Sequence, residues 1–292
     1  MQGIILKGVG SFYTVLGAKG KTYTCKARGK FRIRGETPLP GDRVEFEPPD
    51  GGEGYLLEIL PRKNAFVRPA VANVDQLVVV MAASAPKPDL LLTDRLLLDC
   101  ERRKVEPLLV VNKCDERDEA LLNDVLGQYA PAGYRVIVAS AREGVGLEAL
   151  KLALYKKVSC FTGQSAVGKS SLLNALLPTL HMPVGELSKK VERGKHTTRH
   201  VELVPAYGGA VADTPGFSLL ESGELEPEAL ASLYPEMRGH LGECYFTACL
   251  HVTEPDCAVK RLLGEGGLSR GRYERYCELV KELVEMRKHK YD

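Results

Sequence analysis

One stretch of the chain has the residue spacing of a phosphate-binding loop. It follows the apolar run 158–162 and opens the helix-like segment 169–177, which is the context that this motif requires. Its glycines let backbone amides approach phosphate oxygens, and the start of a helix adds a favourable dipole. We therefore predict nucleotide binding, with Lys169 on the β- and γ-phosphates and the Ser170 hydroxyl on a magnesium ion. The predicted nucleotide contacts of this loop are Gly163, Gln164, Ser165, Ala166, Val167, Gly168, Lys169, Ser170 and Ser171.

A second polar motif indicates which base the nucleotide carries. Asn112, Lys113 and Asp115 follow an apolar run, so they lie at the carboxyl end of a predicted strand, where open α/β sheets bind ligands. The Asp115 carboxylate could accept hydrogen bonds from the ring N–H and exocyclic amine of guanine, which adenine cannot supply. Asn112 and Lys113 would brace the loop and pack on the base. Ser140 and Ala141 end the next strand, where their backbone could meet the guanine carbonyl, so the pattern predicts GTP.

Two further segments could complete the magnesium site. Asp213 and Gly216 belong to the sequence Asp-Thr-Pro-Gly, in which the carboxylate would hold magnesium through a water and the glycine amide would sense the γ-phosphate. The same four residues also suit a β-turn, which is the alternative interpretation. The polar segment 194–198 could supply a threonine to the magnesium ion. The pattern favours Thr198 over Thr197 but does not separate them.

The order of these motifs differs from that of ordinary GTPases. The guanine-reading residues come before the phosphate-binding loop, whereas the usual order places them after Asp-x-x-Gly. The same sheet and site survive such a rearrangement if the original termini were close enough to join. The sequence therefore predicts a circularly permuted GTPase.

A cluster of three cysteines and one histidine could bind a metal. The spacing Cys244-x4-Cys249-x-His251-x5-Cys257 supplies three thiolates and an imidazole, a donor set that suits tetrahedral zinc. With all four positions filled by protein, the predicted zinc ion is structural and stabilises a small loop-rich unit. The alternative is a coincidental grouping of thiols. The other cysteines are scattered, which suits a reducing compartment better than a disulfide framework.

Three regions must position these residues. Residues 1–62 contain short strands with glycine-rich breaks, which predict a small all-β barrel. Residues 63–223 alternate apolar runs with helical periodicity, which predicts a parallel sheet covered by helices on both faces. Residues 224–292 form a smaller unit with the cysteine cluster and a final helix. The expected strands of the first region are 4–9, 12–16, 21–27, 43–46 and 55–59.

Basic residues alternate in the first region. If the strand geometry of 21–27 continued, one face would present a stripe that could follow an RNA backbone. The alternative is a solvated strand face or a partly looped segment. The residues of this stripe are Lys26, Arg28, Lys30, Arg32 and Arg34.

The composition is that of an ordinary globular protein. The chain has 292 residues, of which 44% are hydrophobic and 27% charged, and a net charge of +2, which excludes a disordered or fibrous protein. This charge gives no global basic field, so RNA would have to meet a local patch. No stretch has the length of an apolar membrane helix and no signal peptide begins the chain, so we expect a cytoplasmic protein.

Taken together, these residues resemble the RsgA/YjeQ family of ribosome small-subunit-dependent GTPases. The resemblance covers essentially the whole chain and rests on the motif order, the segments 194–198 and 213–217, and the cysteine spacing. It implies an N-terminal OB-fold, a central circularly permuted GTPase and a C-terminal zinc-binding helical domain. It further implies that the partner is the maturing 30S subunit with its 16S rRNA, and that the protein is a late assembly factor. We expect a monomer.

The resemblance also bears on catalysis. Ras-like proteins place a water-orienting glutamine after Asp-x-x-Gly, whereas this chain has Phe217, which cannot orient water. The histidine of the family's Gly-x-His-Thr-Thr segment is the implied replacement, which here is His196. Lys195 stands where the family more often has arginine, and lysine loses the planar fork of that side chain. A GTP-gated RNA clamp with negligible chemistry and a factor acting on mature ribosomes are the alternatives.

Overall fold

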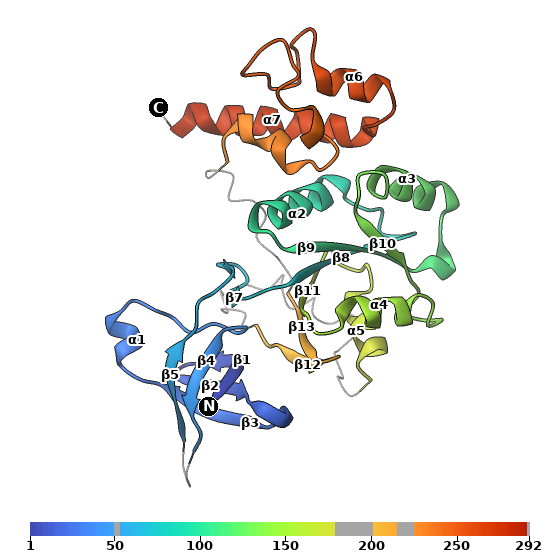
Figure 1. Ribbon diagram of the computed structural model, residues 1–292. Helices are drawn as coiled ribbons and strands as arrows, with labels where there is room; N and C mark the ends of the chain where they lie inside the picture. Colours follow the sequence, from blue (N-terminus) through green and yellow to red (C-terminus); the bar gives the residue numbers. More distant parts are fainter. Residues whose placement is uncertain (50–52, 179–200, 215–224, 291–292) are drawn as a thin grey trace.

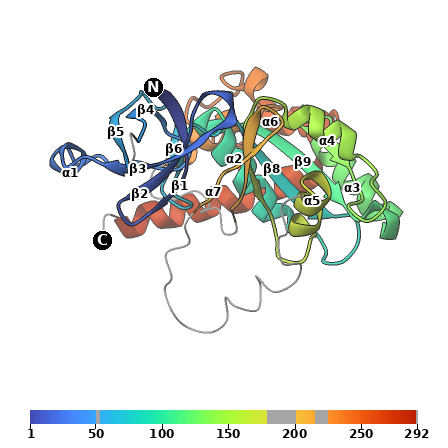
Figure 2. The ribbon, with the colours of Figure 1, turned by 90° about the horizontal axis from the view of Figure 1, so that it is seen from below.

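The computed structural model describes residues 1–49, 53–178, 201–214 and 225–290. Figure 1 shows three parts in chain order: a barrel (blue), a sheet with helices on both faces, and a helical C-terminal part (orange to red). Figure 1 shows the long last helix above the sheet, and in Figure 2, which is seen from below, this helix lies behind the sheet. Among the described residues, none of the helices combines the length and apolar character needed to cross a bilayer.

The N-terminal part is a closed five-stranded barrel. Its strands are hydrogen-bonded in the order β1-β2-β3-β5-β4, and β4 pairs back with β1 to close it. Alternate apolar side chains, such as Ile5, Val15, Val44 and Phe46, point inward and are fully buried. This topology is that of an OB-fold, as predicted. The strands are β1 (Gln2–Val9), β2 (Phe12–Leu16), β3 (Thr22–Ala27), β4 (Arg43–Glu47) and β5 (Gly54–Ile59).

The predicted continuation of the third strand through the basic stripe is wrong. β3 ends at Ala27, and the chain then forms the short helix α1 (Lys30–Ile33). Phe31 explains the change, because its side chain is 2% exposed and belongs to the barrel core. In a helical turn residues four apart share a side, and the Arg34 N–H donates to the Lys30 carbonyl. The five basic residues therefore do not share one strand face.

The central part is built on a six-stranded sheet of order β10-β9-β8-β11-β13-β12. Every neighbouring pair is parallel except β12 with β13. Those two strands are joined by Tyr207 and Gly208, with φ of 49° and 76°, the conformation of a tight antiparallel hairpin turn. The parallel sheet is confirmed apart from this edge. The strands are β8 (Gln76–Ala82), β9 (Glu106–Asn112), β10 (Arg135–Val138), β11 (Val158–Thr162), β12 (Val204–Ala206) and β13 (Gly209–Asp213).

Helices cover both faces of this sheet (Figure 1). Alternate residues of β8 enter two different cores: Val79 packs in the cluster that holds Leu96 of α2, and Val80 in the cluster that holds Leu172 of α5. The runs of β-branched residues in the sequence arise from this burial on both faces. The helix α4 was not predicted. The helices are α2 (Leu90–Arg103), α3 (Glu119–Tyr129), α4 (Leu147–Leu154) and α5 (Lys169–Leu176).

The C-terminal part packs its last helix against α2. Tyr234, Met237 and Tyr276 are fully buried in its core, and Leu98 of α2 belongs to the same apolar cluster. The core of this part is therefore completed by the central part. Its elements are η4 (Pro227–Leu233), η5 (Arg238–His240), α6 (Ala258–Gly264) and α7 (Arg270–Lys290).

A short strand contact joins the barrel to the central part. The Leu203 N–H donates to the Leu6 carbonyl at 2.8 Å, and Lys7 forms an ion pair of 2.6 Å with Glu202. A small hairpin of β6 (Ala65–Phe66) and β7 (Val71–Ala72) lies between the two parts in sequence. The chain that enters β12 is thus fixed to the barrel.

Candidate nucleotide site and metal centre

The predicted nucleotide residues lie at the carboxyl ends of neighbouring parallel strands. Asn112 ends β9 beside Ala82 of β8, and residues 163–168 connect β11 to α5. Because parallel strands end at the same sheet edge, this arrangement brings together segments that are far apart in sequence. Ser165 and Ala166 of the connecting loop are exposed, whereas Val167 is buried and Ser170 and Ser171 are half-buried at the start of α5.

Two positions of the loop require glycine. Gly163 and Gly168 have φ of 128° and 91°, respectively, in the region that other residues rarely adopt. A Cβ on Gly163 would lie 2.0 Å from the Val80 carbonyl oxygen, and one on Gly168 would lie 2.4 Å from Nδ2 of Asn112. The glycines of this motif therefore allow the loop to pack directly on β8 and on the end of β9.

Asn112 joins the guanine-reading segments to the phosphate-binding loop. Its side chain is buried, and Nδ2 donates to the Val167 carbonyl at 2.9 Å. Its Oδ1 accepts from the Ala141 N–H at 3.2 Å. The bracing predicted for Asn112 is thus present in the structure, and one side chain holds both segments in position.

Asp115 is held as a carboxylate beside Ser140. The Ser140 hydroxyl donates to Asp115 Oδ1 at 2.6 Å, and this bond is the main reason why the pKa of Asp115 is lowered. Arg142 lies 3.9 Å from Oδ2 and acts in the same direction. A charged carboxylate whose second oxygen, Oδ2, takes no part in the bond to Ser140 can accept two N–H groups from guanine.

Lys169 lies inside the loop that it follows. Its Nζ donates to the carbonyls of Gly163 and Gln164 at 2.8 and 2.5 Å, respectively. Burial lowers the pKa of Lys169, and the charge of Asp213 opposes that shift. Asp213 reaches this region because β13 pairs with β11, which sets it opposite Phe161. An anionic phosphate would stabilise the buried ammonium in the same way as Asp213 does.

The cysteine cluster has the geometry of a tetrahedral metal site. The ligand atoms of Cys244, Cys249, His251 and Cys257 all lie within 4.8 Å of one another. The two sulfurs of Cys244 and Cys257 are 3.9 Å apart, and tetrahedral zinc would separate two thiolates by roughly 3.8 Å. His251 directs Nδ1 at these sulfurs, at 3.5 and 3.3 Å. The residues therefore fit a metal ion.

Contacts around the cluster hold its ligands in place. The Ala258 N–H donates to the Cys244 sulfur at 3.3 Å, and the Glu254 carboxylate accepts three backbone N–H groups of the loop around His251. Burial lowers the pKa of His251, which favours the neutral imidazole that metals require. The Tyr273 hydroxyl donates to the His251 carbonyl at 2.9 Å, so α7 fixes this loop. Such outer contacts are typical of metal sites.

Comparison with known proteins identifies the family. The model of the RsgA GTPase family matches residues 59–222, and that of the RsgA N-terminal domain matches residues 2–56. The chain is 46% identical to the small ribosomal subunit biogenesis GTPase RsgA of Ruminiclostridium cellulolyticum, over 99% of this chain and 95% of the relative. The corresponding protein of Halalkalibacterium halodurans is 43% identical over 99% of both chains.

The chain belongs to the RsgA GTPase family. Two solved structures are similar to it: YjeQ from Thermotoga maritima, with a TM-score of 0.84, 36% identity and coverage of 97% of this chain and 98% of that one, and YloQ, described as a circularly permuted GTPase, with a TM-score of 0.81, 37% identity and coverage of 98% and 95%. Membership of this family confirms the predicted GTP hydrolase, the permuted motif order and the resemblance noted from the sequence.

Several predicted site residues lie outside the described part of the chain. These are the proposed RsgA-type catalytic histidine, both candidate magnesium threonines and the γ-phosphate glycine, namely His196, Thr197, Thr198 and Gly216.

The basic residues of the barrel are partly engaged with acidic ones. Lys26 pairs with Glu53 at 2.5 Å, and Arg28 pairs with Glu47 at 2.9 Å. Arg28 also lies over the ring of Tyr55. Both basic side chains keep more than a third of their surface exposed, so they remain accessible to a polyanion.

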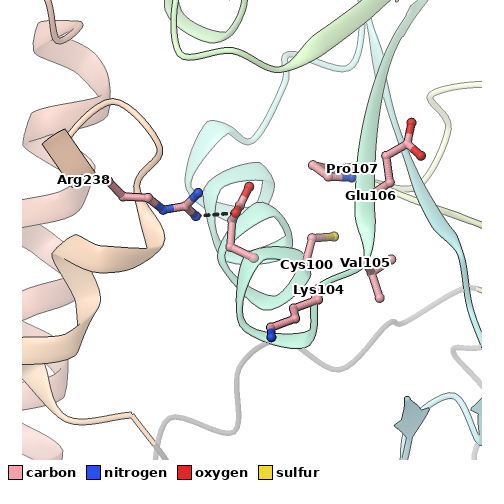
Figure 3. Close-up of a pocket in the computed structure, with 7 residues that line it drawn as sticks. Cys100, Lys104, Val105, Glu106, Pro107 and Arg238 are labelled. Atoms are coloured by element: carbon pink, nitrogen blue, oxygen red, sulfur yellow. Dashed lines mark hydrogen bonds and ion pairs between the residues drawn. The ribbon is translucent and has the colours of Figure 1, made fainter. Parts of the chain in front are cut away.

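A separate hollow lies at the opposite end of the sheet (Figure 3). It is formed where α2 meets the start of β9 and η5, and the Arg238 side chain donates to Glu101 across it. Since Asn112 is at the other end of β9, this hollow is not part of the candidate nucleotide site. Its lining residues are Cys100, Glu101, Lys104, Val105, Glu106, Pro107 and Arg238.

The sequence reasoning missed one role of Gln164. It was predicted only as a nucleotide contact, yet its Oε1 accepts from the Asp89 N–H at 2.9 Å and its Nε2 donates to the Lys87 carbonyl at 3.3 Å. Gln164 is the x that follows the first glycine of the motif, a position that the motif leaves unspecified. No sequence pattern could have linked it to residues more than seventy positions away.

Proposed function

We propose that the chain is a GTPase that binds the small ribosomal subunit, assists its late maturation and hydrolyses GTP faster when bound to it. The relatives' names, small ribosomal subunit biogenesis GTPase, support the ribosomal role. The site itself supports the substrate, because Asn112 ties the loop of Lys169 to the segments of Asp115 and Ser140. A single guanine nucleotide requires this joint placement of base-reading and phosphate-binding groups.

In this proposal each group of the site has a separate task. Asp115 reads the guanine edge, and the amides of 163–168 and Lys169 hold the phosphates. Ser170 and Asp213 would hold Mg²⁺, which when bound would neutralise developing charge on the phosphates. Thr198 and Gly216 add the GTP-specific contacts. His196 replaces the missing glutamine by orienting the attacking water, a role inferred from the family resemblance.

The proposal extends to the other two domains. We assign 1–62 to an OB-fold that contacts 16S rRNA through the five basic residues around α1, 63–223 to the permuted GTPase and 224–292 to the C-terminal domain. The metal of that domain is assigned as Zn²⁺, because thiolate-rich tetrahedral sites select this ion among abundant metals. The protein acts as a cytoplasmic monomer.

Turnover with and without purified 30S subunits tests the proposed function. We expect slow hydrolysis by the free protein and faster hydrolysis with the subunits. Equal rates in the two assays would refute stimulation. Replacing His196 by alanine separates an enzyme from a GTP-gated RNA clamp, because a negligible single-turnover rate on the subunit that this change leaves unaltered would favour the clamp. Faster turnover only with mature 70S ribosomes would favour a factor acting after assembly.

Guanine specificity has its own test. The Asp115→Asn variant should lose affinity for GDP by about 100-fold or more, because its amide presents a donor to the guanine amine. It should gain affinity for xanthosine diphosphate, whose base carries a carbonyl at that position. Retained GDP affinity in this variant would exclude Asp115 as the guanine-reading residue.

A further inference from the structure

The α2 helix is bound to the C-terminal domain through a buried carboxylate. Asp94 is 1% exposed, and it accepts from Arg272 at 2.6 Å and from Arg275 at 2.5 Å. It also accepts from the Tyr129 hydroxyl at 3.0 Å. Arg272 is itself 1% exposed and donates to Glu236 at 2.5 Å. Buried charges with this many partners hold a single relative position of the two elements.

A second ion pair continues this contact along both helices. The Arg95 guanidinium donates to both oxygens of Glu282, at 2.7 and 2.5 Å. Leu98, one turn further along α2, is buried in the apolar core of the C-terminal domain. Charged and apolar contacts thus make α2 part of the C-terminal body as well as of the GTPase sheet.

The other end of α2 is held by both nucleotide motifs. Gln164 of the phosphate-binding loop contacts the Asp89 N–H and the Lys87 carbonyl immediately before the helix. Asp89 in turn caps the helix, since its carboxylate accepts from the Leu92 N–H. Lys113 of the guanine-reading motif donates to the Ala85 carbonyl at 2.6 Å. Residues 85–89 are therefore the place where the two motifs meet the start of α2.

We infer that α2 couples the nucleotide site to the C-terminal domain, with Gln164 as the positioning residue at the nucleotide end. This inference rests on the proposed function only in taking the ligand to be a guanine nucleotide. Any shift of the loop of Lys169 between GDP and GTP forms moves the groups that hold 87–89, and α2 carries that shift to Asp94 and Arg95. Coupling between two binding sites is reciprocal. The factor by which a nucleotide changes the affinity of the C-terminal domain for a partner is therefore also the factor by which that partner changes the affinity for the nucleotide.

Charge reversal at the half-exposed pair tests the inference. The measured quantity is the ratio of the Kd values for GDP and a non-hydrolysable GTP analogue, with Mg²⁺ present. Arg95→Glu and Glu282→Arg should each change this ratio at least about threefold, and the double variant should restore it. An unchanged ratio in both single variants would overturn the inference. The matched control is Lys151→Glu, which breaks the exposed pair with Glu148 on α4 and should leave the ratio unaltered.

The role of Gln164 is tested by combining variants. In a Gln164→Ala background, Arg95→Glu should change the Kd ratio much less than in the wild type, because only Lys113 then still holds the start of α2. A full effect of Arg95→Glu in that background would refute Gln164 as the link. Failure of wild-type protein to bind guanine nucleotides would instead refute the proposed function, so the two failures are distinguishable.

Hydrogen exchange of the wild-type chain gives an independent test that needs no variant. GDP binding should slow amide exchange at 87–92, next to Gln164, and also along 272–282 of α7. Slower exchange confined to 87–92 would show that the effect ends within the GTPase domain, and the inference would be wrong.

Discussion

The Ser140 hydroxyl and the Asp115 carboxylate form a hydrogen bond of 2.6 Å that joins the segments following β9 and β10. Ser140 also accepts from the Glu143 N–H through the same oxygen, at 3.1 Å. The hydroxyl thus orients the carboxylate and is itself held by its own turn. The serine side chain therefore contacts the predicted guanine-reading carboxylate, whereas the sequence predicted only a backbone contact of this segment with the guanine carbonyl.

We predict that Ser140→Ala weakens guanine-nucleotide binding about tenfold, the scale of one hydrogen bond to a charged group. The pKa of Asp115 should rise toward its ordinary value, while the group stays ionised at neutral pH. Fluorescence titration with a labelled GDP measures the change.

Asp118→Asn is the matched control for this variant. Asp118 caps α3 through the N–H groups of Ala120 and Leu121, and asparagine is an equally good cap. The Asp118→Asn variant should bind GDP with the affinity of the wild type. Equal affinity of Ser140→Ala and wild type would exclude a role of this hydroxyl in orienting Asp115.

A methyl group at Gly168 should damage both stability and binding. Gly168→Ala would hold alanine at φ 91° and place Cβ 2.4 Å from the Asn112 amide, so we expect a loss of at least about 2 kcal/mol. Displacement of Asn112 should also raise the Kd for GDP by about 100-fold. Urea unfolding and nucleotide titration measure the two effects.

The opposite result is expected for Gly127→Ala. Gly127 lies within α3, and a Cβ there meets no atom within 4 Å. Removing a helical glycine at an exposed site should stabilise the protein by about 0.5–1 kcal/mol and leave nucleotide binding unaltered. If the two alanine variants behaved alike, the close packing at Gly168 would not be what the loop depends on.

Loss of one thiolate should release the metal. Cys257→Ser replaces a buried ligand that also precedes α6, and we expect bound zinc to fall from ~1 per chain to a small fraction of that. Elemental analysis of purified protein measures the metal, and hydrogen exchange in α6 should accelerate. A strong zinc chelator should reproduce both effects in the wild type.

Cys277→Ser provides the comparison, because Cys277 is half-buried on α7 and outside the metal-binding group. This variant should keep its zinc. Full zinc content in Cys257→Ser would mean that the ion is bound elsewhere or by other residues.

Removal of the buried guanidinium should be the most destabilising of these changes. Arg272→Met leaves Glu236 and part of Asp94 without their partner inside the protein, and breaking such a buried pair costs about 3–5 kcal/mol. Urea unfolding followed by circular dichroism measures the loss. Arg287→Met removes ion pairs of α7 that are 39–62% exposed and should cost less than about 1 kcal/mol. Similar losses in both variants would contradict the importance of the buried network.

Local patterns predicted the parts of the fold that depend on neighbouring residues. The phosphate-binding loop and Asn112 were recognisable because each motif follows an apolar strand and lies at one sheet edge. The helix α1 was missed because alternating basic residues imitate a strand, while one buried side chain, Phe31, decides the backbone. The α4 helix has only three buried residues, Leu150, Ala153 and Leu154, too few to give a clear period.

Contacts between distant segments could not be predicted in this way. Asp94 and Arg272 are 178 positions apart, and neither residue differs in sequence from an ordinary surface charge on a helix. Only the packing of α7 on α2 removes both from water and makes them partners. The docking of the C-terminal helix on the GTPase domain therefore had to come from the structure.

The contact between Leu6 and Leu203 affects how the domains could be studied separately. The segment that contains His196 starts after α5 and ends on a strand anchored to the barrel, whereas the segment that contains Gly216 starts at Thr214, bonded to Phe161, and ends at the C-terminal domain. Each outer domain therefore contacts the described chain beside one stretch that holds predicted site residues, the barrel at Leu203 and the C-terminal domain at Leu225. An isolated fragment spanning 63–223 would lack both contacts. We therefore expect its rate of GTP hydrolysis to differ from that of the intact chain.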